Sequence, residues 1–105
     1  MTRILIADDS EVVRRGIRHL LGEHDGWEVC GEAADGQETI AKVRQLVPDV
    51  VVLDFAMPVM NGIEVARKIR EERPNIAIVL CSMYFDRQLA SRSLSRGRKM
   101  HQSRK

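Results

Sequence analysis

The sequence predicts an α/β protein in which a parallel β-sheet carries helices on both faces. Four apolar runs of strand length alternate with segments of about 10 to 14 residues whose apolar positions recur at helical spacing, which is the pattern of βαβ units. The length of 105 residues, 44% of them apolar, suits one small domain. Polar residues stand where three of the runs end, at Asp8, Asp9, Asp54 and Ser82. Ligands of parallel sheets bind beyond these C-terminal strand ends, so a functional site is expected there.

The first predicted strand and helix lie on either side of two aspartates. Residues 3–7 are apolar enough for a buried strand, and the run stops at Asp8 and Asp9. Ser10 is a favourable N-cap for the helix that follows, which we expect to end near Gly22. This helix is predicted to be amphipathic, with the apolar positions Val12, Val13, Ile17, Leu20 and Leu21.

The middle of the chain supplies the next two strands and the helix between them. Residues 27–33 form the second predicted strand, and Asp35 with Gly36 begins a helix that Pro48 terminates. Residues 50–54 are the most continuous β-branched run and are predicted to form a central parallel strand. The helix is expected to present one face to the core, made of Thr39, Ile40, Val43, Leu46 and Val47.

A third helix and a fourth strand complete the regular pattern. Gly62 opens the helix and Pro74 ends it, with apolar positions at Ile63, Val65, Ala66 and Ile69. Residues 76–80 are the fourth apolar run, and we expect the strand to continue through Cys81 to Ser82. Cys30 and Cys81 are too few for a disulfide scaffold and are expected to be buried, reduced thiols.

The three aspartates are predicted to form a metal site. Two like charges about 4 Å apart repel by about 4 kcal/mol at an effective dielectric of about 20. A bound cation would offset this repulsion between clustered carboxylates. An all-oxygen ligand set suits Mg²⁺ or Mn²⁺. Any one of these aspartates alone would be explained by a helix cap or a strand end. The combination of Asp8, Asp9 and Asp54 with Ser82 favours the metal site.

Three segments carry a specific resemblance. They are ILIADDS at residues 4–10, VVVLDFAMPVMNG at residues 50–62 and IVLCS at residues 78–82. Together they resemble the CheY-like receiver domain of bacterial two-component response regulators. The stretch GEAADG at residues 31–36 is similar to the NarL/LuxR-type subclass. The resemblance extends from Arg3 to about Gly97, and it implies a flavodoxin-like, doubly wound parallel sheet.

The resemblance also implies a role for each site residue. Asp54 would be the phosphoacceptor, a carboxylate nucleophile that becomes an aspartyl phosphate. Asp8, Asp9, Asp54 and the backbone carbonyl of Ala56 would bind Mg²⁺. Ser82 would contact the phosphoryl group and switch the following loop inward. The phosphoryl donor would be a sensor histidine kinase or a small acyl phosphate, and the domain would be no enzyme beyond its own phosphorylation and dephosphorylation.

A phosphatase of the haloacid dehalogenase type is an alternative with the same kind of nucleophile. That class needs a second acid two residues after the nucleophile, where this chain has Ala56. The three histidines, His19, His24 and His101, show no metal or catalytic spacing. The phosphoacceptor interpretation is therefore preferred.

The C-terminus departs from the family pattern. Receiver domains of this type continue into a fifth strand, which ends in a lysine, and a fifth helix. Residues 98–105 are instead basic and are predicted to be a disordered tail. We therefore expect an incomplete receiver domain at residues 1–97, with strand order 2-1-3-4 and an atypical or truncated end. The fourth strand would then be an exposed edge through which the protein self-associates.

Two functional classes remain open from the sequence. One is a phosphorylatable receiver that signals by protein contact, and the other is a degenerate receiver that acts as an interaction or dimerisation module without productive phosphotransfer. The charge distribution adds a weaker alternative. Residues 1–86 carry 10 basic and 15 acidic residues, whereas residues 87–105 carry 7 basic residues and no acidic one. Nucleic-acid binding by this tail is expected to be non-specific at most. No apolar segment long enough for a membrane span is found, and a cytoplasmic location is expected.

Overall fold

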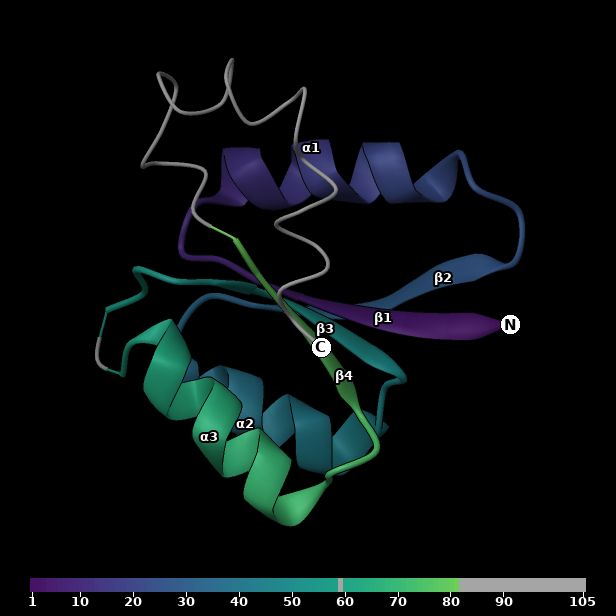
Figure 1. The fold of residues 1–105 in the computed structure, drawn as a ribbon. Helices are drawn as coiled ribbons and strands as arrows, with labels where there is room; N and C mark the ends of the chain where they lie inside the picture. The colour runs from purple at the N-terminus through teal and green to yellow at the C-terminus, as the bar shows by residue number, and fades with distance from the viewer. Residues whose placement is uncertain (59, 82–105) are drawn as a thin grey trace, which may run out of the picture.

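The computed structural model describes residues 1–58 and 60–81 and contains one parallel β-sheet between two layers of helices (Figure 1). The four strands lie in the order β2-β1-β3-β4, and every neighbouring pair is parallel. Helix α1 covers one face of the sheet, while α2 and α3 lie side by side on the other face. The elements are β1 (Thr2–Ala7), α1 (Glu11–Gly22), β2 (Trp27–Ala33), α2 (Gly36–Leu46), β3 (Val50–Asp54), α3 (Gly62–Glu72) and β4 (Ala77–Cys81).

This architecture confirms the predicted fold class, the strand order 2-1-3-4 and the alternation of strands and helices. The predicted bounds of β2, β3 and the start of α3 coincide with the observed ones. Three predictions lie outside the described residues: the position of Ser82, the missing fifth strand and helix, and the basic tail at residues 98–105.

Each helix begins at a side-chain cap. Ser10 Oγ accepts a hydrogen bond from the Val13 amide at 3.2 Å, as predicted. Asp35 Oδ1 accepts from Glu38 at 2.8 Å, and Asn61 accepts from the amide three residues ahead in the same way. Such caps satisfy amides that have no partner within the helix, and each stabilises its helix by about 1 kcal/mol. The caps therefore fix where the chain turns from strand-end loop into helix.

The main hydrophobic core lies on one side of the sheet. Alternate residues of β1 and β3, among them Leu5 and Val51, point toward α2 and α3 and are fully buried. No α1 residue belongs to this cluster, and none is buried. The cluster comprises Leu5, Ala7, Ala33, Ile40, Val43, Val51, Leu53, Met57, Val65, Ile69, Ile76 and Ile78.

Four apolar positions are more exposed than the helical patterns predict, and one of them is Ile63 of α3, which is 45% exposed. Val12 and Leu20 are 74% and 68% exposed, because they lie on a flank of α1 while Val13 and Ile17 are half-buried. Val47 is 48% exposed, because α2 ends at Leu46 and the backbone there turns into the left-handed region with φ of 45°. The α conformation is disfavoured immediately before a proline, and Pro48 thus takes the buried place instead.

Among the helices within residues 1–58 and 60–81, none is both long and apolar enough to cross a lipid bilayer.

Candidate functional site

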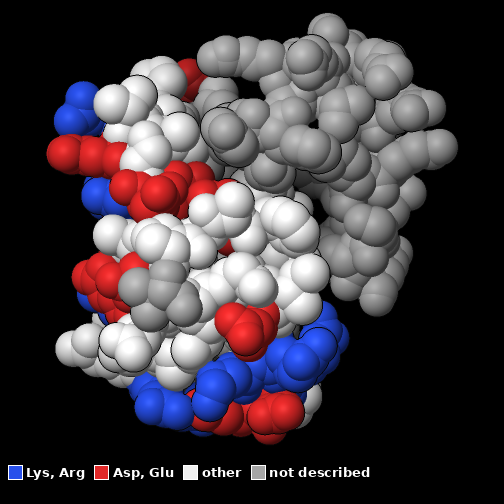
Figure 2. Space-filling model, turned by 90° about the vertical axis from the view of Figure 1, so that its left-hand side faces the viewer, with Lys and Arg blue, Asp and Glu red and all other residues white. Residues whose placement is uncertain are grey.

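Two buried carboxylates meet at the C-terminal edge of the sheet, on the side of the molecule that faces the viewer in Figure 2. Asp54 is the last residue of β3, and Asp8 directly follows β1, whose Ala7 pairs with Leu53. Asp8 and Asp54 are only 3% and 6% exposed, whereas the neighbouring Asp9 is exposed. One carboxylate oxygen from each of Asp8, Asp9 and Asp54 lies within 4.8 Å of the others. We call these three residues the acidic cluster, and its formation confirms that the predicted strand ends converge.

Backbone amides in the loops orient both buried carboxylates. The Ser10 amide donates to Asp8 Oδ1 at 2.8 Å, and the Ala56 amide donates to Asp54 Oδ1 at 3.1 Å. In each case the donor lies two residues after the aspartate, so the turn leaving the strand fixes the side chain. Within the described chain, the second oxygen of each carboxylate has no hydrogen-bond donor. Both residues therefore keep an oxygen available for a ligand.

The acidic cluster is electrostatically unfavourable without a cation. Burial is the largest influence that raises the pKa of Asp8, and the negative charges of Asp54 and Asp9 raise it further. Burial likewise raises the pKa of Asp54, with a further contribution from Asp9. The hydrogen bonds from Ser10 and Ala56 oppose these shifts without cancelling them. An oxygen-only set with two buried members suits a hard divalent cation such as Mg²⁺, whose charge would remove the repulsion.

The loop after Asp54 is packed closely against the end of the strand. The Phe55 amide donates to the Cys81 carbonyl at 2.8 Å, and the Gly62 amide donates to the Phe55 carbonyl at 3.0 Å. A Cβ at Gly62 would lie 2.6 Å from the Asp54 carbonyl oxygen, so only glycine fits there. Ala56 is exposed within this loop. Its backbone carbonyl as a metal ligand stays a prediction.

The β4 side of the site is described only as far as Cys81. Cys81 pairs with Asp54 in the β3–β4 register, so its half-buried thiol belongs to the surroundings of the acidic cluster. Burial, with a smaller contribution from the charges of Asp54 and Asp8, raises the pKa of Cys81 to about 11. Cys81 therefore borders the site as a neutral thiol. Ser82, the predicted phosphoryl contact, lies outside the described residues.

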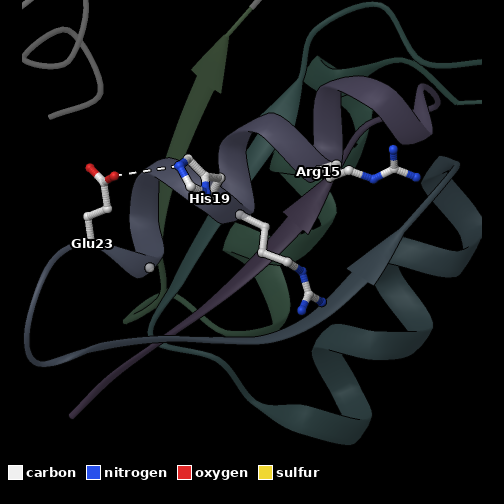
Figure 3. A pocket seen from close by; sticks show the side chains of 5 residues that line it. Arg15, His19 and Glu23 are labelled. Carbon is white, nitrogen blue, oxygen red and sulfur yellow. Dashed lines mark ion pairs between the residues drawn. The ribbon is translucent and has the colours of Figure 1, made fainter.

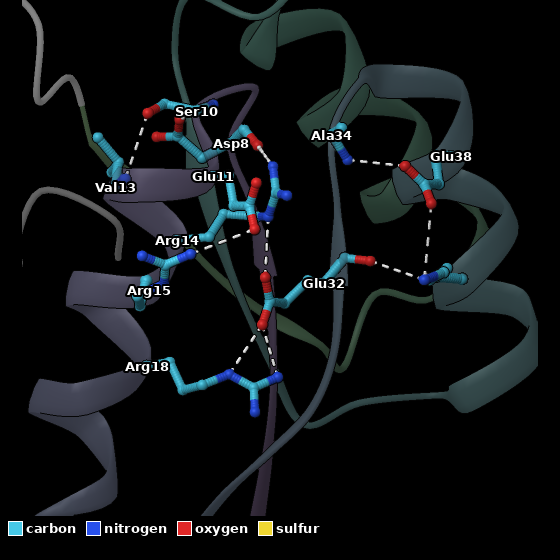
Figure 4. Close-up of polar contacts among 11 residues, drawn as sticks. Asp8, Ser10, Glu11, Val13, Arg14, Arg15, Arg18, Glu32, Ala34 and Glu38 are labelled. Carbon is cyan, nitrogen blue, oxygen red and sulfur yellow. Dashed lines mark hydrogen bonds and ion pairs between the residues drawn. The ribbon is translucent and has the colours of Figure 1, made fainter.

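A polar network beside the acidic cluster was missed by the sequence analysis (Figure 4). Arg14 of α1 donates through Nη1 to the backbone carbonyl of Asp8 at 2.7 Å and through Nε to Glu32 Oε1 at 2.8 Å. Arg18 donates to Glu32 Oε2 at 2.8 Å. Burial acts to raise the pKa of Glu32, but the hydrogen bonds and charges of the two arginines outweigh it, and this pKa is lowered. The available signal was a glutamate near the end of β2 and an arginine about one turn into α1, the helix that precedes β2.

A surface groove of about 440 Å³ lies elsewhere on α1 (Figure 3). Its described lining comes from the C-terminal part of that helix and its end, and it includes none of the acidic cluster. His19 Nε2 and Glu23 Oε2 lie 3.5 Å apart on its rim, and both side chains are well exposed. The lining residues are Arg15, Arg18, His19, Gly22 and Glu23. Their mixed charge and exposure give no chemistry comparable to that of the strand ends.

Comparison with protein families gives a match over nearly the whole chain. The model of the response regulator receiver domain matches residues 4–101. This range includes every residue of the acidic cluster and of the polar network beside it.

Two curated relatives illustrate the range of similarity. The response regulator GacA of Pseudomonas viridiflava is 38% identical over 97 residues, which cover 92% of this chain and 45% of that protein. The chemotaxis protein CheY of Thermotoga maritima is 35% identical over 97 residues, which cover 92% of this chain and 80% of that protein. The chain therefore spans less than half the length of GacA but most of the length of CheY.

Solved structures agree with the fold. The response regulator domain of Thermotoga maritima CheB has a TM-score of 0.76 at 29% identity, covering 92% of this chain and 73% of that one. A LuxR-family two-component response regulator from Aurantimonas sp. SI85-9A1 also has a TM-score of 0.76, at 35% identity, covering 92% of this chain and 70% of that one. Both similarities extend over the sheet and its helices.

Proposed function

Because the chain belongs to the response regulator receiver domain family, we propose that it is a phosphoacceptor in two-component signal transduction, phosphorylated on Asp54 with Mg²⁺ or Mn²⁺ bound at the acidic cluster. The observation that carries this proposal is the approach of Asp8, Asp9 and Asp54 to within 4.8 Å at the C-terminal edge of the sheet. A signalling domain of this kind catalyses nothing beyond its own phosphorylation and dephosphorylation.

The position of Asp54 suits a nucleophile. Strand β3 lies between β1 and β4, so Asp54 has the carboxylates of Asp8 and Asp9 on one side and the end of β4 on the other. The Ala56 amide holds Oδ1, which leaves the other oxygen to attack phosphorus. A P–O bond to Asp54 forms while the P–N bond of a phosphohistidine, or the P–O bond of an acyl phosphate, breaks and leaves its electron pair on the donor.

The other two carboxylates would hold the cation. Asp9 would bind it directly, and Asp8 directly or through water, with Asp54 and the Ala56 carbonyl completing the protein ligands. A divalent ion at this position supplies charge that neutralises the carboxylates and the phosphoryl oxygens during in-line transfer. The raised pKa values of Asp8 and Asp54 show that their ionised forms are destabilised in the absence of a cation, and a bound divalent ion would stabilise those ionised forms.

The remaining parts of the proposal concern signalling. We place the receiver domain at residues 1–97, assign it to the NarL/LuxR-type subclass and give Ser82 the contact to the phosphoryl group. The similarity to the LuxR-family regulator supports the subclass. The phosphoryl donor would be a sensor histidine kinase or a small acyl phosphate, and the site of action the cytoplasm.

A second candidate function is an interaction module without productive phosphotransfer. Strand β4 pairs with β3 along one edge, and no strand of the described sheet pairs with its other edge. Leu80 of this strand is partly exposed. Residues 98–105 offer no apolar run for a further strand, so we expect this edge to stay unpaired within the chain and propose self-association through β4 with a second copy.

The first experiment separates these candidates. The full chain is incubated with acetyl phosphate and Mg²⁺, and the phosphoryl adduct is measured by intact mass. We expect one adduct that is absent in Asp54→Asn, absent after chelation of the metal, and retained in Asp25→Asn, which changes an exposed turn residue. An adduct that persists in Asp54→Asn, or no adduct in the wild type, would contradict phosphorylation at Asp54.

The second candidate is tested by molar mass. Size-exclusion chromatography with light scattering at micromolar concentrations should show dimers, and Leu80→Lys should shift them to monomers because a lysine on an edge strand opposes pairing. A wild-type monomer at every concentration would exclude self-association through β4.

A further inference from the structure

Among the three carboxylates of the acidic cluster, that of Asp9 is the least fixed by burial and by hydrogen bonds in the described chain. Asp8 and Asp54 are buried, and each accepts a backbone hydrogen bond. Asp9 is exposed, and within residues 1–58 and 60–81 no N–H group donates to its carboxylate. Its position in space therefore depends on the backbone that carries it, starting with the peptide between Asp8 and Asp9.

The two peptide groups on either side of the Asp8 Cα are each held by one hydrogen bond. The Asp8 amide donates to the carbonyl of Ala33 at the end of β2 at 3.0 Å, which anchors the residue to the sheet. The Asp8 carbonyl accepts the 2.7 Å hydrogen bond from Arg14 Nη1. Because this carbonyl and the Asp9 amide share one planar peptide group, Arg14 sets the rotation of the peptide from which the Asp9 side chain projects.

Arg14 is itself fixed by Glu32. The Arg14 side chain is 17% exposed, and its Nε donates to Glu32 Oε1 at 2.8 Å. Lys42 of α2 donates to the backbone carbonyl of Glu32 at 2.7 Å and forms an ion pair with Glu38 at 3.6 Å. Glu32 is therefore held by α2 as well as by α1 (Figure 4). Hydrogen bonds between charged groups with low exposure are about twice as strong as neutral ones.

The ion pair between Arg14 and Glu32 also weakens the repulsion between Arg14 and a bound cation. A guanidinium beside the acidic cluster repels a divalent cation, but the Glu32 carboxylate reduces the net charge that Arg14 presents there. The arginine can then hold the Asp8 carbonyl without competing with the metal. Arg18 shares Glu32 with Arg14, but its side chain is 53% exposed, and no hydrogen bond connects it to Asp8 in the described structure.

We propose that Arg14 is a positioning residue for the metal site, holding the Asp8–Asp9 peptide so that the Asp9 carboxylate faces the cation, with Glu32 fixing and neutralising Arg14. The inference rests on the proposed function, because it assumes that the acidic cluster binds Mg²⁺. Residues that orient metal ligands in this indirect way commonly change metal affinity by about 10- to 100-fold when they are mutated.

Arg14 and Arg18 form a matched pair for the test. Arg14→Gln removes the hydrogen bond to the Asp8 carbonyl and one bond to Glu32, whereas Arg18→Gln removes only contacts to Glu32. Mg²⁺ binding to the full chain is measured by isothermal titration calorimetry at fixed ionic strength and at a temperature where all variants are folded. We expect Arg14→Gln to weaken binding by about 10-fold and Arg18→Gln by less than about 2-fold.

Backbone NMR gives an independent readout. The Asp9 amide proton belongs to the peptide that Arg14 holds, so its resonance should shift in Arg14→Gln and stay in place in Arg18→Gln. A purely structural role for Arg14 would lower the midpoint of unfolding and leave both this resonance and the Mg²⁺ affinity of the folded protein unchanged.

The outcomes distinguish this inference from the proposed function. Failure of the wild type to bind Mg²⁺ would overturn the proposed function, and Asp9→Asn serves as the binding-deficient control. Wild-type affinity in Arg14→Gln, or equal losses in both arginine variants, would overturn the positioning role alone. If Arg14→Gln does not fold, Arg14→Lys and Arg18→Lys replace the pair. A lysine cannot hold the Asp8 carbonyl and Glu32 in the same fork, so Arg14→Lys should still bind at least about 3-fold more weakly.

Discussion

Replacing Asp54 by asparagine should stabilise the metal-free protein at neutral pH. Asn keeps an Oδ1 that can accept the 3.1 Å hydrogen bond from Ala56, while the negative charge is removed. Asp8 and Asp54 are both buried, and their closest oxygens lie within 4.8 Å. At an effective dielectric of about 20, charges at this distance repel by about 3 kcal/mol. Because each carboxylate charge is spread over two oxygens, we expect the free energy of unfolding to rise by about 1–3 kcal/mol.

The pH dependence of this gain has a definite sign. The pKa of Asp54 is raised in the folded protein above its ordinary value of 3.8, first by burial and then by Asp9. The folded state therefore holds the proton more tightly than the unfolded state, and wild-type stability falls as the pH rises through the raised pKa. The advantage of Asp54→Asn should be fully present once the pH exceeds the raised pKa and should shrink as the pH is lowered toward 3.8.

Urea unfolding followed by fluorescence measures the effect. The single tryptophan, Trp27, begins β2 and stacks on His24 with ring centroids 3.6 Å apart, so its emission should report unfolding. Asp25→Asn, at an exposed turn, is the charge-matched control and should change stability by no more than about 0.5 kcal/mol. Saturating Mg²⁺ should stabilise the wild type more than Asp54→Asn and close the gap. Equal or lower stability of metal-free Asp54→Asn at pH 7 would refute the electrostatic reasoning.

Three further experiments, on the cap of α1, on two glycines and on Cys81, test other parts of the structure. Ser10→Ala should cost about 1 kcal/mol in urea unfolding because α1 loses its cap, and an unchanged midpoint would contradict that role. Gly62→Ala should lower both stability and Mg²⁺ affinity, since its Cβ would lie 2.6 Å from the Asp54 carbonyl, whereas Gly16→Ala, with nothing within 4 Å, should stabilise the protein by about 0.5–1 kcal/mol. In a Cys30→Ser background, alkylation of the folded protein at Cys81 should be slow at pH 8 and accelerate up to a pH of about 11, and fast alkylation at pH 8 would contradict the raised pKa.

Much of the fold could be predicted because turn and cap residues mark element ends. Ser10, Asp35 and Asn61 are the N-caps of α1, α2 and α3, and Pro48 follows the end of α2. The face of β1 and β3 that packs on α2 and α3 could not be predicted in this way, because both runs are apolar throughout and show no alternation. The exposure of Val47 was not predicted, since hydropathy does not report the left-handed turn that precedes a proline.

The acidic cluster could be predicted from the sequence, but the hydrogen bonds through which Arg14 holds the backbone of the cluster could not. Strand ends of a parallel sheet converge by topology, so Asp8 and Asp54 could be paired without coordinates. The contacts of Arg14 with the Asp8 carbonyl and Glu32 depend on the direction of one long side chain between α1 and β2. Periodicity places an arginine on a polar helix face but does not show which buried acceptor it reaches.

The one-sided core has a consequence for local opening of the chain. Helix α1 contributes no buried residue, whereas α2 and α3 interlock with the sheet, so the two helical layers should open with different free energies. Amide hydrogens of α1 should exchange with solvent through a small local opening, while those of β3 should exchange only through global unfolding. Because Asp9 adjoins the Ser10 cap of α1, Mg²⁺ bound at the acidic cluster should slow exchange along the whole helix. Deuterium uptake in α1 would then report the occupancy of a metal site that lies just before the first turn of the helix.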